Sequence, residues 1–394
     1  MPSSDLDLRI DRDYLVDSLV DLVRINSVNP DLVASAPGEA EIGRYLAAAL
    51  RRLDVATDFH ELAPGRVNVI GTLKGAGNGR SLMLNAHMDT VGVEGMRDPF
   101  SAEVREGRLY GRGAQDMKGS IAAILAALKA LQTSGSRLRG DLIVTFVADE
   151  EYGSIGTEHV VRHVKTDAAI VAEPTGLDIC LAHKGFWVFE LETTGRAAHG
   201  GCPEDGIDAN MHMGRILSQL GILSSELRAA PPHPLVGAPS LHVPLMSGGD
   251  QLFIYSARCK MTVERRTVPG ETAEDALGEV EAILAWLREA DPQFRATVRP
   301  VLGREPYEIS PEAEIVQVLT ASASRTLSEK PEYVGHSWWE DSALIGERGT
   351  ETAIIGPRGG GIHSSEEWVE IESAVQLAEI LARTAVDYCG LAGD

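Results

Sequence analysis

The spacing of hydrophobic residues along the chain predicts helices alternating with short strands. Apolar residues recur every three or four positions over residues 14–25, 39–53 and 120–131, which is the period of an amphipathic helix. Short apolar runs lie at residues 82–86, 142–148, 168–172 and 353–355. Such runs are typical of strands buried on both faces. The pattern therefore predicts an α/β fold with a mostly parallel, helix-covered sheet.

The pattern changes between about residues 184 and 298. Segments 185–195 and 252–264 indicate longer, partly alternating strands, and segments 207–220 and 272–290 indicate two amphipathic helices. The Pro- and Gly-rich stretch 229–249 indicates a long loop. We therefore expect one domain formed by residues 1–183 and 299–394, with a small α+β domain, residues 184–298, inserted into it. A length of 394 residues also favours two domains.

Charge and hydropathy exclude several classes of partner. The chain has 36 basic and 58 acidic residues, a formal net charge of -22, which repels nucleic acid and anionic lipid. No stretch reaches the roughly 20 apolar residues that span a bilayer, and the N-terminus lacks the pattern of a secretory signal. We expect a soluble cytoplasmic protein that binds neither nucleic acid nor membrane.

Several common motifs are missing from the sequence. The four cysteines (Cys180, Cys202, Cys259 and Cys389) form no CxxC pair, which argues against a disulfide framework or a structural zinc knuckle. His159 and His163 are four residues apart but lack the Glu directly after the first His that a zincin requires. Neither a GxGxxG nor a GxSxG motif occurs. Hydride-transfer and serine-hydrolase chemistry are therefore disfavoured.

Histidine and acidic residues follow the predicted strands. His87 follows the first apolar run, Glu150 and Glu151 follow the second, Glu173 follows the third, and a Gly-rich loop after the fourth leads to His363. The carboxyl ends of parallel strands meet at one edge of a sheet, where ligands bind. Imidazole and carboxylate groups are suitable ligands for zinc and similar ions. The sequence therefore predicts a metal site at this edge.

Two aspartates could belong to the same site. Asp116, just before the helix 120–131, is either a metal ligand or an ordinary carboxylate at a helix start. Asp89 either caps a turn or hydrogen-bonds the ring nitrogen of His87 that faces away from the metal. The adjacent Glu150 and Glu151 either form a solvated acidic turn or divide two roles, one binding metal and the other reaching a water.

Five motifs in this order resemble the M20 metallopeptidase family, over nearly the whole chain. They are H-M-D-T-V at His87, L-Y-G-R-G with D-M-K-G at Asp116, D-E-E ending at Glu151, A-E-P-T at Glu173 and G-I-H-S at His363. Members include acetylornithine deacetylase, succinyl-diaminopimelate desuccinylase, aminoacylase and a carboxypeptidase that removes glutamate. The resemblance implies a zinc-exopeptidase-like catalytic domain with an inserted lid or dimerisation domain.

The resemblance also implies two divalent metal ions, each held by one histidine and two carboxylates. The ligands are His87, Asp116 and Glu173 for one ion, and Asp116, Glu151 and His363 for the other. Asp116 bridges the ions, Glu150 is the general base and Asp89 orients His87. Zinc is the first expectation, although cobalt and manganese suit similar ligands.

The inserted region resembles the family in its substrate-binding elements. His199 corresponds to a histidine that reaches the active site of the partner subunit and steadies the oxyanion, which implies a homodimer. Arg266 corresponds to an arginine that holds a substrate carboxylate, and Asn210 either faces the substrate or is only structural. Two positions depart from the usual pattern, because Glu264 replaces an Asp and Gly200 replaces an Ala or Ser.

These residues predict hydrolysis of the amide bond of an N-acyl amino acid, similar to that of acetylornithine deacetylase. Glu173 favours deacylases and carboxypeptidases over aminopeptidases, and Glu150 would activate a water between the metals. Carboxypeptidase, dipeptidase and desuccinylase activities remain open, and a catalytically silent metal-binding protein is an alternative of another class. Trp338 and Trp339, just before Asp341, either line a substrate pocket or belong to the core.

Overall fold

The computed structural model describes residues 8–393 and divides the chain into two units. The first comprises the residues up to Leu181, Ile309–Val334 and those from Glu340 onward, and the second comprises Ala182–Glu308 and Gly335–Trp339. The second unit extends beyond the predicted residues 184–298. β12 (Ala296–Arg304), which crosses the predicted boundary at residue 298, pairs with β9 (Gly185–Thr194) within this unit.

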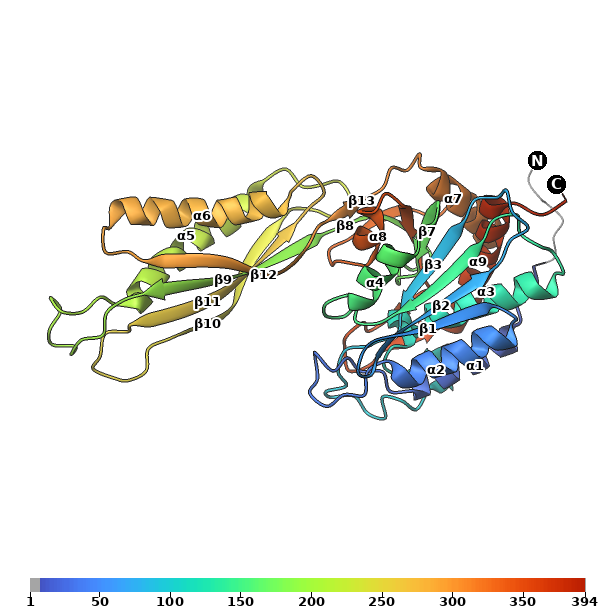
Figure 1. The fold of residues 1–394 in the computed structure, drawn as a ribbon, viewed down its shortest axis with the longest axis horizontal. Helices are drawn as coiled ribbons and strands as arrows, with labels where there is room; N and C mark the ends of the chain where they lie inside the picture. The colour runs from blue at the N-terminus through green and yellow to red at the C-terminus, as the bar shows by residue number, and fades with distance from the viewer. Residues whose placement is uncertain (1–7, 394) are drawn as a thin grey trace. The chain divides into compact units, whose positions relative to one another are not determined.

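A large mixed sheet forms the centre of the first unit (Figure 1). Its strand order is β1-β2-β6-β3-β7-β15-β8-β13, and β14 pairs with β8. The strands are β1 (Ala56–Ala63), β2 (Arg66–Leu73), β3 (Leu82–His87), β6 (Leu142–Val147), β7 (Ala168–Val171), β8 (Ile179–His183), β13 (Tyr307–Glu308), β14 (Tyr333–His336) and β15 (Glu351–Ile354). The central strands β6, β3, β7 and β15 are parallel, and β1, β2, β8 and β13 are antiparallel to their neighbours. The predicted α/β fold with a mostly parallel central sheet is confirmed.

Helices cover both faces of this sheet (Figure 1). They are α1 (Arg12–Arg24), α2 (Ala40–Arg52), α3 (Gly119–Thr133), α4 (Ile155–His163), α7 (Glu314–Leu327), α8 (Ser342–Gly346) and α9 (Ile371–Cys389). On one face, Val160 of α4 and Ile345 of α8 pack against Met83 and Val171 of the sheet. On the other face α3 is buried and packs against α1 and α9. The helices predicted over residues 14–25, 39–53 and 120–131 are thus confirmed as α1, α2 and α3.

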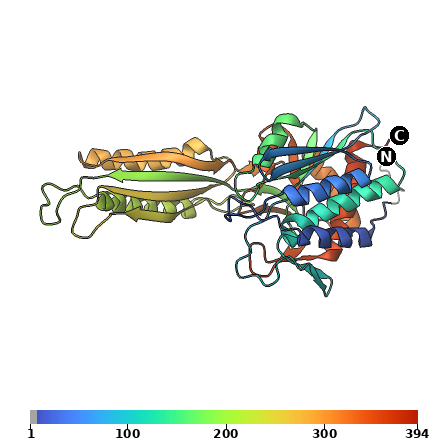
Figure 2. The same cartoon turned by 60° about the horizontal axis from the view of Figure 1, so that its bottom comes forward.

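The second unit is a four-stranded antiparallel sheet with two helices (Figure 2). The strand order is β10-β11-β9-β12, with β10 (Ser240–Gly248) and β11 (Arg258–Thr267) on one side of β9. Side chains of α5 (Ala209–Ala229) and α6 (Ala273–Ala290), including Ile216 and Leu284, form one core with Phe189 and Val263 of the sheet. Both helices were predicted from their periodicity.

Two predictions for the second unit were wrong. The stretch 229–249 is not one loop, because it contains the edge strand β10. An edge strand tolerates Pro244, and the register of β10 shifts between His242 and Leu245. The predicted strand 252–264 begins only at Arg258. Before it, Phe253 adopts a left-handed φ of 68°, and its side chain is 80% exposed, so the apolar residues there mark a surface loop.

A small sheet brings distant parts of the first unit together. It has the order β16-β17-β5-β4, formed by β16 (Gly359–Gly360), β17 (Trp368–Glu370), β5 (Arg108–Tyr110) and β4 (Glu103–Arg105). Pairing of β17 with β5 places the segment before Trp368 beside the residues that follow Tyr110. The residues that follow Tyr110 continue into the short irregular helix η1 (Ala114–Lys118), which carries Asp116.

All four cysteines are free, and Cys180, Cys259 and Cys389 are buried whereas Cys202 is partly exposed. Of the helices formed by residues 8–393, none is both long and apolar enough to cross a membrane.

Candidate metal centre

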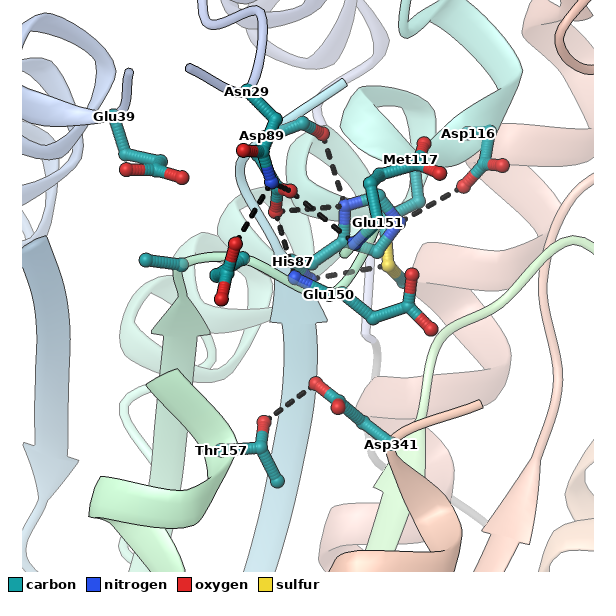
Figure 3. A network of polar contacts seen from close by, with 12 residues as sticks. Asn29, Glu39, His87, Asp89, Asp116, Met117, Glu150, Glu151, Thr157 and Asp341 are labelled. Atoms are coloured by element: carbon teal, nitrogen blue, oxygen red, sulfur yellow. Dashed lines mark hydrogen bonds and ion pairs between the residues drawn. The ribbon is translucent and has the colours of Figure 1, made fainter. Parts of the chain in front are cut away.

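The predicted ligands of the first ion and the predicted general base, Glu150, gather at one edge of the central sheet. His87 is the last residue of β3, Glu150 follows the end of β6, and Glu173 follows the end of β7. Asp116 reaches the same place from η1. Figure 3 shows His87, Glu150 and Asp116 near one another at the end of a central strand. His87, Asp116 and Glu173 are buried.

The carboxylate of Asp116 faces two groups of ligands. Its Oδ1 lies 2.9 Å from Nε2 of His87, which is also 3.5 Å from Oε1 of Glu173. Its Oδ2 lies 3.3 Å from Nε2 of His363, which is 3.1 Å from Oε2 of Glu151. In each group the three candidate ligand atoms lie within 4.8 Å of one another. The Asp116 carboxylate is thus placed to contribute one oxygen to each of the two groups.

The pKa values of the candidate ligands are shifted by burial and by the negative charge of neighbouring carboxylates. Burial raises the pKa of Glu173 and of Glu151, and the nearby negative charge of Asp116 raises both further. Hydrogen bonds to Asp116 and Glu151 raise the pKa of His363 to about 10. Burial lowers the pKa of His87, but Glu173 and Asp116 more than offset that effect. These shifts favour the protonated forms of the histidines and of the glutamates, and a bound cation would oppose them.

The residues present fit a pair of divalent cations. Each group supplies one imidazole and two carboxylates, and three protein ligands leave a coordination position open, as in catalytic zinc sites. The ionised carboxylates of Asp116, Glu150, Glu151 and Glu173 would together carry four negative charges, which two divalent ions would balance. The ligand types suit zinc, and also cobalt or manganese.

Asp89 contacts His87 through its backbone rather than its side chain. Nδ1 of His87 lies 3.0 Å from the Asp89 carbonyl oxygen and 3.6 Å from the carboxylate. The carbonyl therefore accepts the ring proton and leaves Nε2 facing Asp116. The Asp89 carboxylate instead accepts hydrogen bonds from the backbone N–H groups of Glu150 and Glu151, at 3.1 and 3.2 Å.

Glu150 is placed beside both groups without belonging to either. Burial and the negative charge of Glu173 raise the pKa of Glu150 well above its usual value, and Asp341 contributes to the effect. Among the described residues, none donates a hydrogen bond to the Glu150 carboxylate, so both oxygens are available to a water molecule. Asp341 is itself buried and accepts a 2.5 Å hydrogen bond from the hydroxyl of Thr157 (Figure 3).

A buried network that the sequence did not reveal holds the segment 149–151. Nδ2 of Asn29 donates to Asp89 at 2.8 Å and to Asp149 at 3.0 Å. Arg66 donates to Asp149 at 2.6 Å and to Glu39 at 2.8 Å. Asn29 lies 60 and 120 residues away from its two acceptors. A single sequence carries no signal for such pairs, although a buried Arg requires acidic partners.

The predicted substrate residues lie in the second unit. The backbone N–H of Gly201 donates to Nδ1 of the exposed His199 at 3.1 Å, so the neutral ring carries its proton on Nε2. Arg266 is partly exposed and donates to Glu264, the residue that departs from the family pattern. Asn210 is exposed in the first turn of α5.

The two tryptophans before Asp341 have different environments. Trp339 is buried, donates to the Glu305 carbonyl at 3.2 Å and makes an edge contact with Phe186. Trp338 is 44% exposed and stacks on His336 with ring centroids 4.3 Å apart. Trp339 is therefore a core residue of the second unit, whereas Trp338 keeps an accessible surface.

Comparison with known proteins identifies relatives of this chain. The chain is 30% identical over 390 residues to acetylornithine deacetylase of Myxococcus xanthus, covering 95% of this chain and 97% of that protein. It is 29% identical to N-formyl-4-amino-5-aminomethyl-2-methylpyrimidine deformylase of Bacillus subtilis, over 88% and 89% of the two chains. A dinuclear metal-binding peptidase of the M20 family from Bacillus subtilis has the same fold, with a TM-score of 0.72, 16% identity and coverage of 96% and 98%.

The match to the family itself extends over most of the chain. The profile of peptidase family M20/M25/M40 matches residues 83–387, which include the five predicted ligands and Glu150. The resemblance predicted from the motifs is confirmed. The chain therefore belongs to peptidase family M20/M25/M40.

Proposed function

We propose that this M20 hydrolase removes the acyl group from an N-acylated amino acid by cleaving its amide bond at a centre of two divalent ions. The observation that carries the proposal is the position of Asp116, whose two oxygens face His87 and His363 separately. A carboxylate shared in this way suits two neighbouring cations. The relative named acetylornithine deacetylase supports deacylation of an amino acid.

The proton transfers are assigned to Glu150. When bound, two divalent ions polarise the amide carbonyl and lower the pKa of a water molecule. The Glu150 carboxylate would accept the proton of that water and later deliver it to the nitrogen of the leaving amine. Asp89 supports this role because its carboxylate holds the backbone N–H groups of Glu150 and Glu151.

We assign substrate recognition to the second unit, acting as a lid. His199 would donate a hydrogen bond from Nε2 to the oxyanion, since its Nδ1 is already an acceptor. Arg266 would pair with the α-carboxylate of the substrate, and Asn210 would contact the substrate from α5. Closure of this unit onto the metal-binding unit would be a step of each turnover.

We further propose that the second unit mediates a homodimer. β10 is an edge strand, and its side chains Leu245 and Met246 are 68% and 55% exposed. Exposed strand edges and apolar side chains favour association with another chain. Light scattering tests this proposal directly, because a monomeric mass at micromolar concentration would contradict it.

The substrate class is tested with a panel of amides. Metal-free protein is assayed with zinc, cobalt or manganese on N-acetylornithine, N-succinyl-diaminopimelate and a dipeptide. The proposal expects metal-dependent release of free amine, fastest from an N-acyl amino acid. Faster cleavage of the dipeptide would instead indicate a dipeptidase or carboxypeptidase, and no turnover with any metal would indicate a silent metal-binding protein.

A formyl amide is a second candidate substrate, because one relative is named as a deformylase of an N-formylated pyrimidine. That compound has no α-carboxylate to pair with Arg266. Comparing N-formyl and N-acetyl derivatives of one amino acid with the N-formylated pyrimidine separates the two classes.

A further inference from the structure

The buried carboxylate of Glu367 lies at the end of the loop that carries His363. It is only 1% exposed, although it has no place in either group of candidate ligands. Its Oε1 accepts hydrogen bonds from the backbone N–H groups of Gln115 and Asp116, at 2.9 and 3.0 Å. Its Oε2 accepts from the backbone N–H of Gly113 at 3.0 Å and from Nη1 of Arg112 at 2.6 Å. One side chain thus accepts four hydrogen bonds from residues 112–116.

These donors need an acceptor because their segment is buried and irregular. Asp116 and Met117 both have non-helical φ and ψ angles, so residues 113–116 do not form a regular helical turn. Buried N–H groups left unpaired are costly, and an ionised carboxylate is the strongest acceptor available in a protein. Arg112 is also buried and donates to the carbonyl of Ser364 at 3.0 Å, which ties the segment to the loop of His363 a second time.

We infer that Glu367 is a positioning residue of the metal centre, an inference that rests on the proposed function. It holds the backbone N–H of Asp116, the residue whose carboxylate is shared by the two ligand groups. It also ends the short segment that begins with His363, a member of the second group. Glu367 therefore fixes the spacing between a shared ligand on one segment and a ligand of the second ion on another.

The inference is tested with Glu367→Gln and with Glu366→Gln as a matched control. A glutamine at position 367 replaces one acceptor oxygen with an NH2 group that faces donors, so at least one N–H loses its acceptor. The neighbouring Glu366 is exposed, and its side chain is 3.5 Å from the guanidinium of Arg105. Both variants are prepared metal-free and titrated with zinc by calorimetry, and bound ions are counted by elemental analysis.

We expect Glu367→Gln to bind zinc about 10- to 100-fold more weakly than the unmodified chain, as is typical when a residue that orients a ligand is changed. Glu366→Gln should bind two ions with unchanged affinity. A purely structural role would lower the melting temperature of the metal-free protein without changing zinc affinity. Unchanged affinity in a folded Glu367→Gln protein would therefore overturn the inference.

A milder variant covers the case in which Glu367→Gln does not fold. Arg112→Lys leaves the carboxylate and its three backbone donors in place but loses the hydrogen bond to the Ser364 carbonyl. A several-fold loss of zinc affinity is expected in this variant. An unchanged zinc affinity would overturn the inference. Failure of the unmodified chain to bind two ions would instead contradict the proposed function, so the two failures are distinguishable.

Discussion

The two units of the molecule hold their functional side chains in different ways. In the first unit, Asp116 and His87 are buried and fixed by short polar contacts. In the second unit, His199 and Asn210 are exposed, and both hydrogen-bond to a residue two positions away: Nδ1 of His199 accepts from the Gly201 N–H, and the Asn210 backbone N–H donates to the Asp208 carboxylate. Asp116 and His87 are thus preorganised for a cation, whereas His199 and Asn210 remain free to meet a substrate. Metal binding and substrate recognition should therefore be separable by mutation.

The histidines illustrate the difference. Both ring nitrogens of His87 have partners, since Nδ1 contacts the Asp89 carbonyl and Nε2 contacts Asp116. In His199 only Nδ1 has a hydrogen-bond partner among the described residues, and Nε2 remains a donor. The same residue type is therefore held by two partners in one unit and keeps an available donor nitrogen in the other.

The largest effect is expected from Glu150→Gln in the first unit. Loss of the general base should lower kcat by about 10²- to 10⁴-fold, while both ions still bind because Glu150 belongs to neither ligand group. Steady-state kinetics and metal counting test this, with the exposed Glu61→Gln as a control. Retention of more than about a tenth of kcat would exclude Glu150 as the base.

His199→Ala should have the next largest effect and tests whether the second unit takes part in turnover. Removal of an oxyanion donor typically lowers kcat by about 10²- to 10³-fold. Zinc affinity should not change, because His199 is in the other unit from the ligands. His199→Gln keeps a side-chain N–H donor and should lose less. If His199→Ala and the unmodified chain had equal kcat, the assignment of substrate recognition to His199 would be wrong.

Two neighbouring arginines of β11, Arg265 and Arg266, should differ in the effect of their replacement. Arg266→Met should lower kcat/KM about 10- to 100-fold for substrates with an α-carboxylate, the value of a hydrogen bond to a charged group. Arg265 is buried between Glu271 at 2.7 Å and Glu279 at 2.9 Å. Arg265→Met should mainly lower the free energy of unfolding, by about 1–3 kcal/mol.

Substrate analogues provide the control for these arginine variants. With an α-carboxamide in place of the α-carboxylate, Arg266→Met and the unmodified chain should have similar kcat/KM. The same large loss on the neutral analogue would show that Arg266 does not pair with the carboxylate.

The pH dependence of zinc affinity should amount to about tenfold per pH unit for each displaced proton. In the metal-free protein the pKa of His363 is raised to about 10, so its imidazole is protonated at neutral pH, and the raised pKa of Glu173 favours the protonated form of that carboxyl. A cation displaces these protons, and zinc affinity should therefore increase with pH.

Calorimetry in buffers of different protonation enthalpy counts the released protons. His199→Ala should release the same number as the unmodified chain, because the titrating groups lie in the first unit. If zinc binding released no protons near neutral pH, the described electrostatics of the ligand groups would be wrong.

Much of the fold could be predicted from periodicity alone. The helices α1, α2 and α3 and the strands β3, β6 and β7 follow their apolar patterns closely, because each buries a face or is buried on both. The failures lie in the second unit. A proline-containing edge strand was predicted as a loop, and an exposed apolar loop before Arg258 was predicted as a strand. Burial, which is a tertiary property, separates these cases.

The sequence by itself determined which residue types stand at the strand ends, and thereby the family and the candidate ligands. His87, Glu150 and Glu173 follow apolar strands that the chain must bury, so local sequence already directs them to one edge. Only the tertiary structure decided how Asp116 is shared between two groups and how Glu367, about 250 residues later in the chain, holds its backbone. Contacts over such separations depend on the packing of the whole unit, and a single sequence does not encode them locally.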